Sequence, residues 1–146
     1  GCGFPNEQAP SPAAEDFLDP GTPATIPEHE IELHTEEPAK RTTELVEVGL
    51  IGGKDYQGYR VYSPRGIGAT MTASGGGRAR CTGAYRVSGG ARGLTPREAA
   101  RMQGLPEWAT HHPVATHALR HAGNALAVPL ARELGRQLAA HLASRT

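Results

Sequence analysis

The chain has 146 residues, its 15 lysines and arginines balance its 15 acidic residues, and 38% of its residues are hydrophobic. No apolar run approaches the roughly 18 residues of a membrane helix, and no stretch has the charged, apolar and small-residue order of a signal peptide. The two cysteines, Cys2 and Cys81, are too few and too far apart for a disulfide framework. These features argue against a membrane protein and a small secreted scaffold, and we expect a cytoplasmic protein.

The neutral total hides a separation of charge along the chain. Residues 1–57 hold 12 acids and 3 bases, about −9, whereas residues 58–146 hold 3 acids and 12 bases, about +9. The planar guanidinium suits phosphates and guanine edges, so a polyanion partner is favoured over a merely solvated basic surface. The segment 58–97 has no acid and seven arginines, namely Arg60, Arg65, Arg78, Arg80, Arg86, Arg92 and Arg97.

The first part of the chain is rich in proline and acidic residues and lacks hydrophobic periodicity. We expect residues 1–43 to be a loop-rich lead-in with a short turn at AEDFL (14–18). From residue 44 the pattern changes to short alternating segments typical of strands. We predict strands at 44–51, 59–63, 67–73 and 84–88, so residues 44–110 are expected to form a small β-rich domain twisted by its glycines.

Helical signals begin near residue 95. In LTPREAARMQG, Thr95 is placed to cap a helix, Pro96 suits its first turn, Glu98 completes a capping box and Gly104 suits a left-handed end. A second helical stretch, VATHALRHA, follows.

Residues 111–146 form the predicted C-terminal helical part, whose last helix is expected to begin at Pro129. Leucines recur there every four residues and define one apolar stripe, which must pack on another surface. They are Leu126, Leu130, Leu134, Leu138 and Leu142.

A glycine triplet stands in the middle of the chain. Gly75, Gly76 and Gly77 would let backbone approach a ligand closely, and their consecutive amides could form an anion nest. No nucleotide-binding pattern fits, because no Gly-Lys-Ser/Thr follows and GIGATM fails GxGxxG. Tyrosines and arginines alternate around the triplet, which is typical of contacts with phosphates and base edges; the alternative is that the tyrosines pack on a core face. This group comprises Tyr56, Tyr59, Tyr62, Tyr85, Arg60, Arg65, Arg78 and Arg80.

No self-contained catalytic set is recognisable. Neither cysteine lies in a Pro-Cys or Cys-His arrangement, and no serine lies in GxSxG. His117 and His121 have a spacing that can bind zinc, but no HExxH, carboxylate or close cysteine supports such a site. We therefore predict no catalytic residue and no metal site in this chain.

Three blocks follow one another along the chain: RVYSPRGIGATMTASGGG with TGAYRV, then LTPREAARMQGLPEW, then HAGNALAVPLARELG. They resemble, in the same order, the target-recognition region, the ninth motif and the tenth motif of DNA cytosine-5 methyltransferases. The resemblance runs from about residue 45 to residue 142, and EDFLDP resembles the segment after the eighth motif. IGGKDYQGYRVYSPRG is most similar to members that recognise GCGC, although Ser74 replaces an expected tyrosine.

The resemblance implies a DNA (cytosine-5-)-methyltransferase. Such enzymes flip a cytosine out of double-stranded DNA, attack it with a Pro-Cys thiolate and transfer a methyl group from S-adenosylmethionine to C5. The cofactor loop and the Pro-Cys loop of the family are not in this sequence. The implied fold is α+β, with a small twisted recognition domain followed by helices that pack on a Rossmann-like catalytic domain. That N-terminal domain or subunit, supplied elsewhere, would be the protein partner.

The same resemblance assigns roles on the DNA side. Gln57 matches the position that fills the space left by the flipped base, and Arg60 matches a guanine-reading arginine. Thr70 and Met71 stand at the family's Thr-Leu pair beside the target.

The remaining matches concern the glycine loop and the cofactor. Gly75 to Gly77 resemble a recognition loop that lies against DNA, with Arg78 and Arg80 able to reach phosphates. Asn124 and Ala125 match the tenth motif, which helps to close the S-adenosylmethionine pocket.

Two interpretations follow from the resemblance. The chain is the recognition portion of a methyltransferase, either cut from a longer chain or encoded as a separate subunit, and its first residue, Gly1 in place of Met, favours the former. Alternatively it is a freestanding DNA-binding remnant without catalysis.

Overall fold

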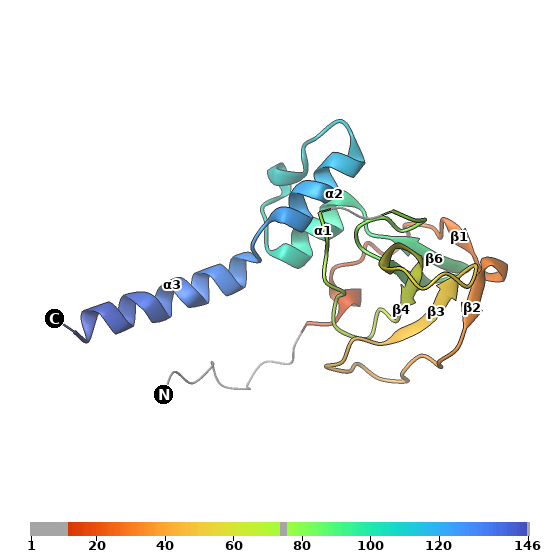
Figure 1. Ribbon diagram of the computed structural model, residues 1–146, viewed down its shortest axis with the longest axis horizontal. Helices are drawn as coiled ribbons and strands as arrows, with labels where there is room; N and C mark the ends of the chain where they lie inside the picture. Colours follow the sequence, from red (N-terminus) through yellow and green to blue (C-terminus); the bar gives the residue numbers. More distant parts are fainter. Residues whose placement is uncertain (1–11, 74–75, 146) are drawn as a thin grey trace.

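A six-stranded sheet lies at one end of the computed structural model, which describes residues 12–73 and 76–145, and the helices lie beside it (Figure 1). The strand order is β1-β6-β5-β4-β3-β2, and only β4 and β5 are parallel neighbours. The two edge strands are consecutive in the chain and are joined by the short 3-10 turn η2 (Glu28–Glu30), so the sheet curls until its edges approach each other. The strands are β1 (Ile26–Pro27), β2 (Ile31–Leu33), β3 (Glu47–Ile51), β4 (Arg60–Tyr62), β5 (Ala84–Val87) and β6 (Gly90–Gly93).

Three of the four predicted strands are confirmed, as β3, β4 and β5. The predicted strand at 67–73 is wrong, because this segment bonds to separate partners instead of one neighbouring strand. The Ile67 amide donates to Glu44, the Ala69 amide to the Tyr85 hydroxyl, and the Thr72 amide to Cys81. A ladder needs one partner that runs alongside, and none does so here.

The lead-in is less irregular than expected. Its turn at AEDFL is confirmed as the 3-10 turn η1 (Ala14–Asp16), but the expectation of loops is wrong for residues 26–27 and 31–33, which form β1 and β2. β6 was not predicted either. A Cβ on its first residue, Gly90, would collide with the carbonyl of Ile26, so glycine is what allows β1 to approach.

Two apolar clusters stabilise the fold. The first lies on the face of the sheet that the curl encloses, and every strand contributes to it. Its members are Ile26, Ile31, Val48, Ile51, Val61, Ala84 and Ala91 from the strands, and Ala79 from a turn. The second lies between the sheet and the helices and is built from Ala14, Tyr62, Ala69, Tyr85, Leu94, Ala99, Leu119 and Ala122. Burial raises the pKa of Tyr85 to about 12, and its hydroxyl accepts the Ala69 amide at 2.8 Å.

The capping box is confirmed. The Thr95 hydroxyl accepts the Glu98 amide at the start of α1 (Pro96–Gln103), the Glu98 carboxylate accepts the Thr95 amide, and Gly104 ends the helix at φ +67°. The short turn η4 (Glu107–Thr110) leads to α2 (Ala115–Asn124), which packs on α1.

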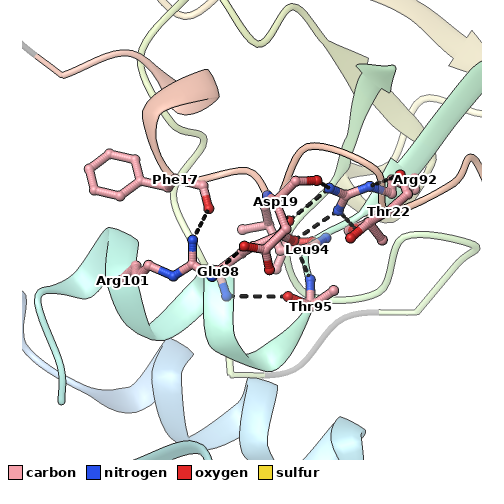
Figure 2. Close-up of polar contacts among 10 residues, drawn as sticks. Phe17, Asp19, Thr22, Arg92, Leu94, Thr95, Glu98 and Arg101 are labelled. Carbon is pink, nitrogen blue, oxygen red and sulfur yellow. Dashed lines mark hydrogen bonds and ion pairs between the residues drawn. The ribbon is translucent and has the colours of Figure 1, made fainter. Parts of the chain in front are cut away.

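A buried ion pair connects the sheet, α1 and the lead-in (Figure 2). The Glu98 carboxylate accepts two hydrogen bonds from Arg92, at 2.7 and 2.8 Å, and one from the Asp19 amide at 2.6 Å. Burial raises the pKa of Glu98, but the hydrogen bonds from Arg92, Thr95 and Asp19 outweigh it, so the net pKa lies below the ordinary carboxyl value. Both side chains are almost fully buried, which makes the pair part of the core.

Helix α3 (Val128–Ala143) extends away from this body (Figure 1). The predicted helix is confirmed, and four leucines of the predicted stripe lie on its surface, whereas Leu126 precedes the helix. Leu126, Leu130, Leu134, Leu138 and Leu142 are 49–60% exposed. None of the helices in the described residues is long and apolar enough to span a membrane.

Candidate nucleic-acid interface

Two separate segments meet at the 3-10 turn η3 (Gln57–Tyr59), which leads into β4. The Gln57 side-chain amide donates to the backbone carbonyl of Thr70. Thr70 is exposed, whereas Met71 is half-buried and packs against the sheet–helix core. Gln57, Thr70 and Met71 are thereby held next to one another.

The glycine loop contacts the same turn through its backbone. A Cβ on Gly58 would collide with the carbonyl of Gly76, and one on Gly77 would lie 2.7 Å from the carbonyl of Gly58. Gly77 also has φ +97°, which other residues rarely adopt. The Ala79 amide donates to Gly58 at 2.9 Å and fixes the end of the loop. Gly75 and Ser74 lie outside the described residues.

Arg60 opens β4 and is held by carboxylates. Its Nε and Nη2 both donate to Oδ1 of Asp55, at 2.9 and 2.7 Å, and Nε lies 3.4 Å from Oε2 of Glu47 on β3. The hydrogen bond to Asp55 is the main reason that the pKa of Arg60 is raised above its ordinary value. The Arg60 side chain is 38% exposed, so a ligand can still reach it.

The two arginines after the glycine loop differ in their partners. Arg78 donates from Nη1 to Glu30 at 2.9 Å, and both side chains are partly exposed. Arg80 has φ +54°, rare for a residue with a side chain, and donates to the hydroxyl of Thr116 on α2. Among the side chains that the structure describes, no carboxylate forms an ion pair with Arg80.

The charge separation along the sequence does not persist in space. Within the part of the chain that the structure describes, at least four of the seven arginines in segment 58–97 form ion pairs, and three of these four pair with acids from residues 1–57. Arg86, for example, pairs with Glu28 at 2.7 Å and Glu37 at 3.3 Å. The arginine count therefore overstates the positive charge available to a polyanion.

The tyrosines divide between the two interpretations given above. Tyr62 and Tyr85 are buried and pack with tilted rings, 6.1 Å between centroids, as expected for core residues. Tyr56 is 68% exposed and contacts the half-buried Tyr59 edge to face.

A cavity of about 550 Å³ is lined in part by the Thr70 segment. Gly123 packs so closely there that a Cβ would lie 2.5 Å from the carbonyl of Thr72, which fixes the end of α2 against this segment. Asn124 is exposed at the last position of α2, and Ala125 follows it into the cavity wall. The cavity thus brings Ala125 to Thr70 and Met71, but Arg60, Arg78 and Arg80 are not in its lining. Met102, Gln103 and Leu130 complete much of the wall.

Sequence reasoning missed the partners that hold the arginines. Asp55 could have been suspected, because it is an acid only five residues before Arg60, whereas Glu30 and Thr116 are distant in sequence from Arg78 and Arg80.

The rings of His112 and His117 approach to 4.9 Å between centroids. Within residues 12–73 and 76–145, no group of three or more His, Cys, Asp or Glu side chains could hold a metal ion.

The comparisons with known proteins agree with these blocks. The profile of the C-5 cytosine-specific DNA methylase family matches residues 24–140, most of the chain. The Type II methyltransferase M.HhaI of Haemophilus parahaemolyticus is 38% identical over 103 residues, which cover 70% of this chain and 31% of that protein. The match thus spans less than a third of the relative's length. The chain belongs to the C-5 cytosine-specific DNA methylase family.

Proposed function

We propose that this chain is the C-terminal target-recognition portion of a DNA cytosine-5 methyltransferase of the restriction-modification type. A catalytic half supplied elsewhere would transfer the methyl group from S-adenosylmethionine to C5 of a flipped cytosine. The observation that carries the proposal is the hydrogen bond from Gln57 to Thr70. It joins the side chain assigned to the space left by the flipped base to the pair assigned to the border of the target.

Arg60 would read a guanine in a GCGC-type site. It lies one 3-10 turn after Gln57 and is partly exposed, so both side chains can face the same duplex. A bidentate contact with guanine O6 and N7 contributes about 1–3 kcal/mol of discrimination. Arg78 and Arg80 would bind phosphates beside the backbone of Gly75 to Gly77, and a phosphate would replace Glu30 as the partner of Arg78.

The cavity beside Ala125 suits one side of a cofactor pocket. Its walls combine apolar groups of Ala125, Met102 and Leu130 with polar groups of Gln103 and Thr70, as an amphipathic ligand requires. S-adenosylmethionine, when bound, would supply the methyl group. Asn124 would offer its exposed amide and Ala125 its methyl group to that pocket, while the catalytic half completes it.

The exposed leucines would pack on the catalytic half. Residues 44–110 then form the recognition domain, to which β1 and β2 of the lead-in add two strands, and residues 111–146 return to a Rossmann-like domain. A stripe of half-exposed leucines supports this, because burying the exposed half of each contributes roughly half of the 1.5–3 kcal/mol that complete burial of a leucine contributes.

Labelled methyl transfer to DNA tests the proposal. The purified chain alone should transfer no label, because it lacks the nucleophile, and addition of the Pro-Cys-containing half should restore transfer. Transfer by the chain alone would show that its catalytic group has been missed. DNA binding without restored transfer would favour the remnant without catalysis.

A further inference from the structure

We infer that Asp55 is a positioning residue that sets how strictly Arg60 reads guanine. The inference rests on the proposed role of Arg60 and concerns a residue that lies outside the DNA contacts assigned above. Asp55 presents one oxygen to two nitrogens of Arg60, at 2.9 Å from Nε and 2.7 Å from Nη2.

The carboxylates hold the guanidinium along one edge, and the buried Tyr62 hydroxyl interacts with it from β4. Nε and Nη2 lie on the same side of the planar group, and Glu47 approaches Nε from β3 at 3.4 Å. The bonds to Asp55 therefore leave the end that carries Nη1 and the second Nη2 hydrogen. That end presents two parallel N–H donors, which is what guanine O6 and N7 require for a bidentate contact.

The same contact disfavours a phosphate as the ligand of Arg60. The side chain cannot swing to the DNA backbone without breaking its bonds to Asp55, and the carboxylate offsets the charge that attracts phosphates. Base contacts specify sequence, whereas phosphate contacts do not. Asp55 thus restricts Arg60 to the contact that carries sequence information.

The two residues stand at opposite ends of η3. The Arg60 amide donates to the carbonyl of Tyr56 at 3.1 Å, which closes the turn, and Gln57 lies between Asp55 and Arg60 in the chain. Asp55 therefore fixes the guanidinium relative to Gln57. Its own side chain is 69% exposed, so its replacement leaves the apolar clusters untouched.

The test uses the complete methyltransferase, with this chain and its catalytic half. We would compare kcat/KM for DNA that carries guanine at the read position with DNA that carries adenine or 7-deazaguanine, which lacks the N7 acceptor. Arg60→Ala should remove most of the discrimination, and Asp55→Ala should lower it at least about fivefold. Asp55→Asn keeps an acceptor oxygen and should lose less. The double variant Asp55→Ala with Arg60→Ala should discriminate between the DNAs no worse than Arg60→Ala alone, because the two changes remove the same interaction.

Glu15→Gln is the matched control. Glu15 is a partly exposed carboxylate paired with Arg41, so its loss changes the net charge equally and should leave the discrimination unchanged. If Arg60→Ala does not alter discrimination, the proposed guanine contact is wrong and the role of Asp55 falls with it. If Arg60→Ala lowers discrimination but Asp55→Ala does not, only the positioning role is wrong. If Asp55→Ala methylated every DNA faster while the ratio of the kcat/KM values stayed unchanged, the carboxylate would act through its charge alone, and the positioning role of Asp55 would also be wrong.

Discussion

The body of the molecule and helix α3 use their side chains in opposite ways. In the body even an ion pair, Arg92 with Glu98, is buried and supplied with hydrogen bonds. In α3 the leucines are about half exposed, and the ion pair of Glu133 and Arg136 lies on the surface, where hydrogen bonds from Arg136 and Gln137 lower the pKa of Glu133 to about 2. Buried contacts within the body therefore stabilise it, whereas the apolar stripe of α3 remains exposed and available for contact with another surface.

The largest effect should come from the buried ion pair. Glu98→Ala leaves the Arg92 guanidinium buried without its carboxylate and removes half of the capping box, so we expect a loss of about 3–5 kcal/mol in the free energy of unfolding. Chemical denaturation measures it. Glu133→Ala on α3, which removes a surface pair, should leave the transition in place. If Glu98→Ala and Glu133→Ala lowered the free energy of unfolding equally, the buried pair would stabilise the chain no more than the surface pair, which would contradict the contrast between the two regions.

Acid should weaken the body through the same carboxylate. The pKa of Glu98 is lower in the folded state than its ordinary value of 4.5, so the unfolded state takes up protons first as the pH falls. The stabilisation is present above that ordinary value and is lost as the pH falls through the lowered folded value. Denaturation midpoints between pH 7 and pH 3 should show a smaller acid loss in Glu98→Gln than in the unchanged chain, once its lower stability at pH 7 is subtracted. Parallel curves would assign the acid loss to other carboxylates.

A smaller effect is expected where β5 meets the 67–73 segment. Tyr85→Phe leaves the buried Ala69 amide without its acceptor, which costs roughly 1–3 kcal/mol. Thermal or denaturant unfolding measures the change. Tyr56→Phe provides the comparison, because Tyr56 is 68% exposed and should lose almost nothing. An unchanged stability in Tyr85→Phe would show that water or a neighbour replaces the hydroxyl.

The smallest effect on folding should come from α3. Leu134→Gln with Leu138→Gln changes only exposed side chains, so the free energy of unfolding of this chain should move by less than about 0.5 kcal/mol per site. Association with the proposed catalytic half should weaken at least about tenfold in Kd, because on that proposal the two leucines are buried in the contact. Calorimetric titration of the two halves measures this change. Unaltered association would place the partner surface elsewhere.

Local signals explain what the sequence predicted well. Thr95, Glu98 and Gly104 lie within one short segment, so the ends of α1 could be located from neighbouring residues alone. β1 and β2 lie in the proline- and acid-rich lead-in, and β6 begins and ends with glycine, so their residue types did not indicate strands even though β4 and β5 are equally short. At 67–73 the pattern was present, but periodicity does not reveal whether a partner strand runs alongside.

In the candidate site, too, the sequence indicated some residues correctly but not the contacts between distant segments. The resemblance named Gln57, Thr70 and the glycines, and the structure brings Gln57, Thr70, Gly76 and Gly77 to one turn. The pairing of Arg78 with Glu30, 48 residues away, depends on how the sheet curls. No local pattern encodes such a contact.

The backbone contact between Gly58 and Gly76 affects how this surface can change over generations. A side chain at position 58 would displace the loop, whereas the exposed Arg78 side chain takes no part in this backbone contact; Arg80 is more restricted, because its φ of +54° suits few residues with a side chain. The exposed position 78 can therefore vary without loss of the contact that anchors the loop. A lineage, or a protein engineer, could alter the chemistry of this edge one residue at a time on an unchanged frame.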